Sequence, residues 1–182
     1  MMLISNAYKR ADYARKRKIY QFVGDNVSLQ IRKIPLYSEL IKLHNNVAIA
    51  RNVDFVTHDV IHCVLNRISN EQYGKDNYSF KEHIGCIEIM DNVFIGSNSV
   101  ILDGVRIGPN AIIASGSIVT KDVKEGTIVG GVPARKIGDF YDYISKRALF
   151  EKNGESTFTT HNQNLTDDEI EGAWRVFEKQ HK

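Results

Sequence analysis

The sequence has little cysteine, with two residues of this type among 182. Cys63 and Cys86 are too few for a disulfide framework, and their spacing does not resemble a set of metal ligands. Such scarcity is typical of a reducing compartment, so we predict a cytoplasmic protein. The first ten residues lack the apolar stretch of a signal peptide, and no run approaches the ~20 apolar residues that cross a bilayer. We therefore expect no membrane span.

The chain also lacks an excess of either charge. Lys and Arg number 24 against 22 Asp and Glu, which gives a net charge of +2. This balance provides no general argument for binding nucleic acid or a membrane, so an anion site would have to be local. With 42% hydrophobic residues, a chain of this length is typical of one globular domain with short extensions.

A six-residue repeat occupies the stretch from Ile89 to Lys124. Because six is even, the recurring residue points to one face of an extended chain, whereas a helix would scatter it. The repeat therefore predicts short β-strands in coils that stack on one another. The first column of the repeat holds β-branched residues: Ile89, Ile95, Ile101, Ile107, Ile113 and Val119. The second column, four positions later, holds small or β-branched residues: Val93, Ser99, Val105, Ala111, Ser117 and Val123.

Residues that tolerate a positive φ lie between these columns, so each short strand can end in a sharp corner. They are Asn92, Gly96, Asn98, Gly104, Gly108, Asn110 and Gly116. An earlier, more degenerate ladder keeps the same spacing at Val23, Leu29, Pro35, Ile41, Val47 and Val53. Between the two blocks, residues 58–84 lack the repeat, which predicts a loop extruded from the solenoid. Long loops on a rigid scaffold usually carry function.

Both ends of the chain read as helical. Residues 6–20 combine six basic side chains with three alanines, which predicts a basic helix that caps the first coil. Thr166 and Glu169 have the spacing of a capping box. The helix that follows has one apolar face, formed by Ile170, Ala173, Trp174 and Phe177, and we expect it to pack on the solenoid or on a neighbouring subunit. We expect residues 153–164 to be irregular. The predicted organisation is a helical cap at 1–22, a solenoid at 23–139 and a helical extension at 140–182.

The repeat block, together with the segments VTKDV at 119–123 and GGVPARKI at 130–137, resembles the hexapeptide-repeat acyltransferases. With FVTHDVIH at 55–62, it is most similar to bacterial capsule and surface-polysaccharide O-acetyltransferases and to the galactoside and maltose acetyltransferase type. This resemblance implies an all-β fold, a left-handed parallel β-helix with short terminal helices. It also implies acetyl-CoA as co-substrate, a sugar hydroxyl as acceptor, no metal, and a homotrimer with active sites between subunits.

Transfer of an acetyl group to a hydroxyl needs a base, and histidine titrates close to neutral pH. His58 begins the predicted loop, which matches the position of the family's catalytic histidine. The resemblance makes His62 a second candidate that contacts the acceptor. Phe94 stands where many relatives have tryptophan, and it is a candidate to flank the acceptor. Asp59 is a weaker candidate to orient an imidazole, because neighbours in an extended segment point to opposite faces.

The resemblance also assigns a coenzyme A site. The phosphates of this molecule need cations at one end of a groove, and the slim pantetheine arm needs small residues along it. A solvated face of the solenoid is the alternative interpretation of the same residues. The candidate cofactor residues are Ser97, Ser115, Thr120, Lys121, Arg135 and Lys136.

Three other functions stay open on the sequence. An N-acetyltransferase of an amino-sugar nucleotide or of an antibiotic would use the same base and cofactor groove. A zinc hydratase like the gamma class of carbonic anhydrase would use His58, His62 and His83, although VTKDV and GGVPARKI favour acyl-CoA. A non-catalytic scaffold would bind partners through the basic N-terminal helix.

Overall fold

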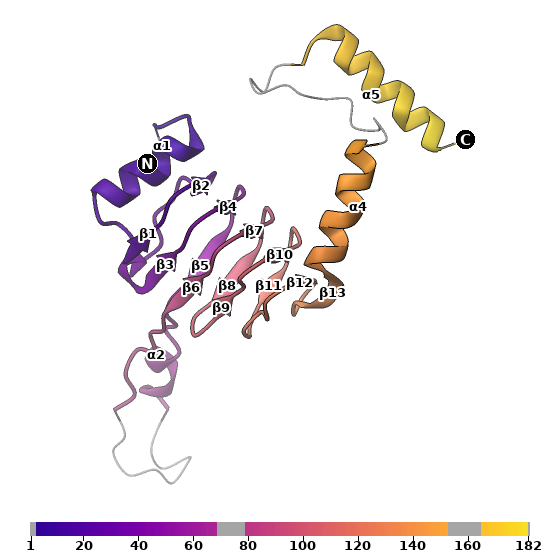
Figure 1. The fold of residues 1–182 in the computed structure, drawn as a ribbon. Helices are drawn as coiled ribbons and strands as arrows, with labels where there is room; N and C mark the ends of the chain where they lie inside the picture. Colours follow the sequence, from indigo (N-terminus) through magenta and orange to yellow (C-terminus); the bar gives the residue numbers. More distant parts are fainter. Residues whose placement is uncertain (1–2, 69–78, 153–164, 182) are drawn as a thin grey trace. The chain divides into compact units, whose positions relative to one another are not determined.

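A computed structural model describes residues 3–68, 79–152 and 165–181 of the chain. The chain splits into two compact units, residues 1–140 and residues 141–182. Among the described residues, the first unit contains all the strands and the second contains helices, so each is described by itself (Figure 1).

The strands of the first unit form three sheets. Sheet A has the order β1-β3-β6-β9, and sheet C has the order β5-β8-β11. Sheet B has the order β2-β4-β7-β10-β12-β13, in which only the last pair is antiparallel. Sheet A comprises β1 (Phe22–Val23), β3 (Ile41–Leu43), β6 (Ile87–Ile89) and β9 (Arg106–Ile107). Sheet B comprises β2 (Ser28–Leu29), β4 (Val47–Ile49), β7 (Val93–Ile95), β10 (Ala111–Ile113), β12 (Thr127–Gly130) and β13 (Arg135–Asp139). Sheet C comprises β5 (Asp54–Val56), β8 (Val100–Leu102) and β11 (Ile118–Val119).

The chain visits sheets A, B and C in turn, and we call each such passage a coil (Figure 1). Coil 2 is β3, β4 and β5, coil 3 is β6, β7 and β8, and coil 4 is β9, β10 and β11. Coil 1 has β1 and β2, followed by residues 30–40 and the short 3-10 helix η1 (Ser38–Leu40) in place of a third strand. Parallel pairing between successive coils satisfies the backbone groups that such short strands expose.

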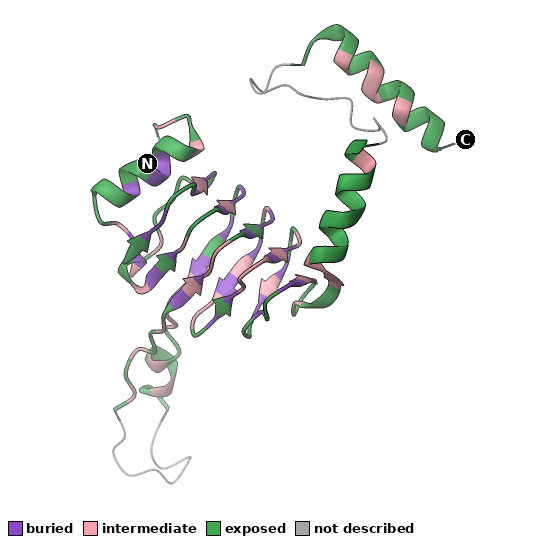
Figure 2. Ribbon diagram, viewed as in Figure 1, coloured by how far each residue is buried: buried purple, intermediate pink, exposed green. Residues whose placement is uncertain are grey.

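The predicted six-residue columns form the core. Every residue of the first column, from Ile89 to Val119, is at most 1% exposed, and the second column, from Val93 to Val123, is at most 6% exposed. In the three-residue strands, buried positions alternate with more exposed ones (Figure 2). The two columns and the β assignment of this stretch are confirmed.

The earlier ladder is only partly right, because it crosses from one column to the other. Leu29 pairs with Ile49, whereas Val47 pairs with Val93, so the two belong to different columns. From Leu29 to Ile49, its partner in the next coil, there are 20 residues (49 − 29), against 18 from Ile95 to its partner Ile113 (113 − 95). The two extra residues lie in 30–40 and keep the inward face because two is even.

The corners contain the expected residues in the expected conformation, with one exception. Asn92, Asn98 and Asn110 have φ of 59°, 60° and 52°, a conformation that asparagine tolerates better than most residues. The side chain of Asn92 also donates to that of Asn110 at 2.8 Å, which links successive corners. Gly96 differs because its φ is not positive, and a Cβ there would lie 2.5 Å from the backbone nitrogen of Ser115. This glycine is required by close packing between coils.

Helix α1 (Ala7–Lys16) covers β1 and β2 at the open end of the coils. Arg10 is buried, and its Nε donates to the carbonyl of Leu29 at 2.6 Å. The Nε of Arg15 donates to the carbonyl of Val23 at 2.9 Å. These carbonyls end β2 and β1, where no further coil supplies a donor. At least two of the six basic residues therefore stabilise the fold, and they do not mark an anionic partner.

The second unit contains two helices, α4 (Phe140–Lys152), which starts at the boundary, and α5 (Asp167–Gln180). The capping box of α5 is confirmed, since the backbone N–H of Thr166 donates to Glu169 at 2.8 Å and the reciprocal bond is present. Trp174 and Phe177 remain exposed. Residues 153–164, predicted to be irregular, lie outside the described residues. No helix in the described part of the chain is long and apolar enough to cross a membrane.

Candidate active site

The loop between coils 2 and 3 leaves the coils through a short antiparallel stem. His58 forms a bridge with Ile84, the N–H of Asp59 donates to the carbonyl of His83 at 3.0 Å, and the N–H of Gly85 donates to that of Thr57 at 2.8 Å. These two-way contacts fix the stem at the end of β5. Within 58–84, residues 69–78 lie outside the described residues.

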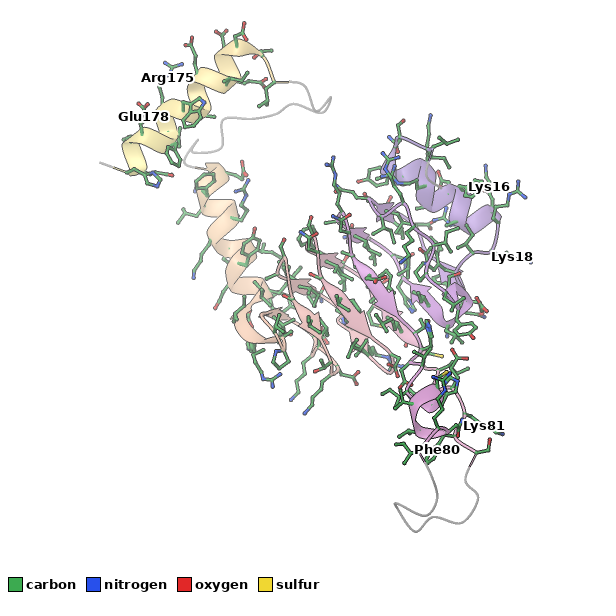
Figure 3. All side chains as sticks on the ribbon, turned by 180° about the vertical axis from the view of Figure 1, so that it is seen from behind. Lys16, Lys18, Phe80, Lys81, Arg175 and Glu178 are labelled. Carbon is green, nitrogen blue, oxygen red and sulfur yellow. The ribbon has the colours of Figure 1, made fainter. Side chains whose placement is uncertain are left out.

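Helix α2 (His62–Leu65) lies beyond the stem and is tied to the returning chain. The side chain of Asn66 donates to the carbonyl of Phe80 and accepts from its N–H, both at 2.8 Å. Figure 3 shows Phe80 and Lys81 on this returning segment beside α2. Bonds between this side chain and the opposing backbone therefore hold the two sides of the loop together beyond the stem.

The antiparallel pairing sorts the stem residues onto two faces. Opposed residues share a face and successive residues alternate, so Glu82, Ile84 and His58 lie on one face, and Asp59 and His83 on the other. The contacts of these side chains agree with this assignment. The first face meets coil 1, and the second meets coil 3.

On the first face, His58 packs edge-on against Tyr37, with ring centroids 5.3 Å apart. The Tyr37 hydroxyl donates to Glu82 Oε2 at 3.1 Å. This hydrogen bond and the negative charge of Glu82 raise the pKa of Tyr37, with smaller contributions from burial and from Glu39. Nδ1 of His58 is buried without a hydrogen-bond partner among the described residues. The imidazole is thus held by a ring contact, and its Nδ1 is left unpaired among the described residues.

On the second face, Nε2 of His83 lies 2.7 Å from Oδ2 of Asp103. The His83 side chain is 64% exposed, while that of Asp103 is 23% exposed. Gly85 allows this close approach, because a Cβ there would lie 2.9 Å from the Asp103 side chain. A carboxylate therefore orients a histidine at the root of the loop.

Asp59 and His62 have other contacts. The Asp59 carboxylate accepts from the N–H of Ile61 at 3.0 Å, and its position on the second face separates it from the His58 ring. Nε2 of His62 lies 3.4 Å from Sγ of Cys63, and its Nδ1 is buried without a partner among the described residues. Asp59 thus closes the turn before α2, and no bond to His58 assigns it an orienting role.

The candidate cofactor residues lie at the two ends of sheet C. The parallel strands of sheet C all end on one side, which we call the carboxyl edge of sheet C. Three residues lie there: His58 after β5, Asp103 after β8 and Thr120 after β11. Lys121 is next to Thr120 on the same edge and is exposed. One edge therefore carries the candidate base and two of the candidate cofactor residues.

Ser97 and Ser115 lie at the opposite edge, at successive corners between sheets B and C. The N–H of Gly116 donates to the carbonyl of Ser97 at 2.8 Å, which stacks the two corners. Arg135 and Lys136 begin β13, and the preceding N–H of Ala134 donates to Ile118 at the start of β11. Both basic residues are exposed. Within one chain, Lys121 therefore lies on the opposite side of sheet C from Arg135 and Lys136.

Phe94 lies on the outer face of sheet B, where it pairs with Ala48 and Ile112 and is 44% exposed. It belongs to a different sheet from His58, so one chain does not bring the two together. The described residues include no group of three or more His, Cys, Asp or Glu that could hold a metal. His58 and His83 point to opposite faces of the stem and do not converge within one chain.

Sequence reasoning missed three residues of this region: Tyr37, Glu82 and Asp103. Tyr37 and Glu82 are 45 residues apart, and His83 and Asp103 are 20 apart. No local pattern marks either pair. The stacking of coils brings them together.

Residues 87–121 match the family described as Bacterial transferase hexapeptide (six repeats). This part of the chain is therefore similar to the repeats of that family. It is 40% identical over 107 residues to Protein CapG of Staphylococcus aureus, covering 59% of this chain and 57% of that protein. A stretch of 52 residues is 62% identical to 2,3,4,5-tetrahydropyridine-2,6-dicarboxylate N-acetyltransferase of Kosmotoga olearia, covering 29% of this chain and 22% of that enzyme. The chain thus spans little more than half of the first relative and about a fifth of the second.

Solved structures of acetyltransferases share the fold of the hexapeptide domain. A hexapeptide-repeat containing acetyltransferase from Vibrio cholerae matches with a TM-score of 0.55 at 23% identity, over 76% of this chain and 84% of that chain. Its complex with acetyl coenzyme A has a TM-score of 0.51 at the same identity, over 76% and 80%. A maltose O-acetyltransferase from Clostridium difficile 630 matches with 0.53 at 26% identity, over 75% and 78%.

Proposed function

We propose that the protein is an acetyl-CoA-dependent O-acetyltransferase that acts on a sugar hydroxyl in the synthesis of a surface or capsular polysaccharide. One observation carries the proposal: His58 shares the carboxyl edge of sheet C with Thr120 and Lys121, within a hexapeptide domain. The maltose O-acetyltransferase match supports a sugar hydroxyl, and the Vibrio cholerae complex supports acetyl coenzyme A as donor. The polysaccharide assignment rests on the sequence resemblance.

In this proposal His58 is the general base. A hydroxyl becomes a competent nucleophile only as its proton is removed, and imidazole accepts a proton near neutral pH. The edge-on contact with Tyr37 restricts the ring, so the base is placed before the acceptor arrives. Backbone N–H groups at the corners are the donors that would stabilise the oxyanion.

Coenzyme A would lie along sheet C. Thr120 and Lys121 would contact its phosphates at the carboxyl edge, since a hydroxyl and an ammonium both donate to phosphate oxygens. The pantetheine arm would run along the same edge, because the thioester must end beside His58. Ser97 and Ser115, at the other edge, would line the cofactor groove from a neighbouring subunit, where small side chains leave room. The outward residues of the sheet between the two edges, Val56, Val100 and Leu102, are half-buried and apolar, which suits an uncharged arm.

We further propose a left-handed β-helix that assembles as a trimer, with each site shared by two subunits. Phe94 is half-exposed on sheet B, whereas His58 of the same chain lies at the end of a strand of sheet C. In a cyclic trimer, sheet B of one copy can face sheet C of the next, and Arg135 and Lys136 would reach the cofactor in the same way. The assembly would thus complete a site that one chain leaves open.

Transfer to an amine is the second candidate. It is favoured by the 62% identity to an N-acetyltransferase over 52 residues. An amine that is unprotonated needs less help from a base than a hydroxyl does. The two reactions therefore differ in how strongly they depend on His58.

Two measurements test the proposal. Calorimetry gives the affinity for acetyl-CoA, and the release of free thiol from acetyl-CoA measures turnover with each of a panel of acceptors. We expect micromolar to submillimolar affinity with about one site per subunit, and acetylation of maltose or a galactoside in preference to glucosamine. His58→Ala should lower kcat by ~10²-fold or more and leave acetyl-CoA affinity unchanged. His44→Ala, on sheet A, is the matched control and should keep wild-type turnover. Absence of acetyl-CoA binding by the folded protein would exclude the acetyltransferase.

A further inference from the structure

We propose that the open end of the coils, which α1 covers, is a docking surface for an anionic lipid bilayer. The surface, which we call the basic cap, comprises the exposed side chains of residues 6–20 and of two flanking segments, residues 3–5 and 32–36. This inference goes beyond acetyl transfer, because it concerns where the protein binds and is tested without a substrate. It assigns a role to the basic residues near the N-terminus that do not stabilise the fold.

The two faces of α1 differ in chemistry. Ala11 and Ala14 are buried on the face that packs on β1 and β2. Lys9, Tyr13 and Lys16 follow one another at intervals of four and three residues, so they share a face of the helix. All three are exposed. The helix therefore presents lysine and tyrosine to its surroundings and alanine to the coils.

The exposed cations of the cap are not neutralised by carboxylates. The acid of the helix, Asp12, pairs with Arg15 at 3.1 Å, and Asp25 lies 3.6 Å from the same guanidinium. Figure 3 shows Lys16 and Lys18 at the end of α1, directed away from the strands. Four basic residues are exposed and form no ion pair among the described residues: Lys9, Lys16, Arg17 and Lys18. On a chain with a net charge of +2, this is a local concentration of positive charge.

The positive charge continues into the segment after β2. The Nε of Arg10 donates to the carbonyl of Leu29, where β2 ends. Burial lowers the pKa of Arg10, and the positive charges of Arg32 and Arg51 lower it further, so these two cations lie near the helix. Arg32 and its neighbour Lys33 are exposed. Coil 1 and α1 thus contribute to one basic surface.

Apolar side chains at the same end distinguish a bilayer from other polyanions. Ile34 and Leu36 of coil 1 are 43% and 59% exposed, and Leu3 is fully exposed. Leu3 is held beside α1, because the carbonyl of the next residue, Ile4, accepts from Arg10 at 2.5 Å. Aliphatic groups can enter the boundary of the acyl chains while ammonium groups stay with the phosphates. A nucleic acid offers no such apolar layer, so the mixture favours lipid.

Anionic headgroups supply the complementary charge. Each Lys or Arg close to an anionic bilayer strengthens binding by about fivefold. In the proposed cyclic trimer, rotation about an axis along the stack of coils would place three basic caps on one side of the assembly. Three caps could then engage one flat surface, and their contributions to binding would multiply. A bilayer is a partner of that shape.

The test is the binding of the intact protein to lipid vesicles, measured by flotation. One set of vesicles is phosphatidylcholine alone, and the other contains about one third phosphatidylglycerol, which supplies the negative charge. We expect binding to the anionic vesicles and none to the neutral ones. Binding should weaken as added salt screens the charges.

A pair of double variants tests whether the basic cap carries the binding. Lys9→Gln combined with Lys16→Gln should weaken binding to the anionic vesicles by ~10-fold or more, because two outer charges are lost. Lys124→Gln combined with Lys146→Gln removes the same charge from exposed residues outside the cap and is the matched control. Its affinity should stay within about twofold of wild type. Thermal unfolding checks that both double variants fold.

Two further measurements separate a bilayer from a soluble polyanion. Leu3→Ser combined with Leu36→Ser keeps every charge and should weaken vesicle binding by about threefold or more, because apolar contact is lost. Duplex DNA at the same phosphate concentration should not displace the wild-type protein from the anionic vesicles. Displacement by DNA, or unchanged binding of the Leu3 and Leu36 variant, would assign the cap to a soluble polyanion and overturn the inference.

The remaining outcomes also decide the inference. Equal binding to neutral and anionic vesicles, or no binding to either, overturns it. Unchanged binding of a folded Lys9 and Lys16 variant overturns it as well. None of these results affects the proposed acetyl transfer, which calorimetry with acetyl-CoA tests separately.

Discussion

At the scale of single residues, the ring and the hydroxyl of Tyr37 have different partners. The ring packs on the imidazole, and the hydroxyl donates to Glu82. Thr57 also donates to the carbonyl of Leu36 at 2.7 Å, so the segment that carries Tyr37 is tied to the stem by a second bond. The ring position is therefore fixed from both sides.

We predict that Tyr37→Phe lowers kcat less than threefold, because the ring remains against His58. Tyr37→Ala should lower kcat by about tenfold, since a base that is free to turn is less often in the reactive orientation. Steady-state kinetics of the two variants, with thermal unfolding as the control for folding, measure the difference. Equal losses in both variants would contradict a positioning role of the ring.

This residue also shows where prediction from the sequence ends. His58 is predicted because it lies where a periodic stretch stops and because the segment around it resembles the acetyltransferase family, and both features are local in the chain. Tyr37 is in the insertion of coil 1, where the six-residue spacing fails, so no period indicates which residue of the next coil it meets. Its contact depends on two extra residues in 30–40, whose effect on register only the folded coils reveal.

At the scale of elements, the regular coils were predictable and their ends were not. An even period forces the buried columns onto one face, so the core from Ile89 to Val119 followed from spacing alone. The helix α1 was also expected as a cap of the first coil, but the sequence left open whether its charge serves the fold or a partner. Composition counts basic residues without showing that Arg10 is directed into the fold.

We predict that Arg10→Met destabilises the protein by about 1–3 kcal/mol, because buried carbonyls at the open end lose a charged donor. Lys9→Met on the same helix is the matched control, since Lys9 is exposed, and should change stability by less than about 0.5 kcal/mol. Urea unfolding of both variants gives the comparison. Equal stability of the two would show that the cap does not depend on this arginine.

At the scale of the whole molecule, the candidate site residues lie on two different sheets of one chain, sheet B and sheet C. His58 lies at an edge of sheet C, while Phe94 and the basic residues of β13 belong to sheet B. Coils that stack in register give each sheet a straight outer face, and such faces suit contact with another copy of the chain. A shared site would explain why both sheets carry candidate residues.

Mixing two inactive variants tests whether each site is shared. His58→Ala and Phe94→Ala should each be nearly inactive alone, because each removes one contribution to every site. In an equal mixture that is unfolded and reassembled, a site between neighbours is intact when one subunit supplies His58 and the next supplies Phe94. Random assembly of a cyclic trimer then restores about a quarter of the wild-type sites. If both residues act within one subunit, no combination restores a site and the mixture stays inactive, which would contradict the shared arrangement.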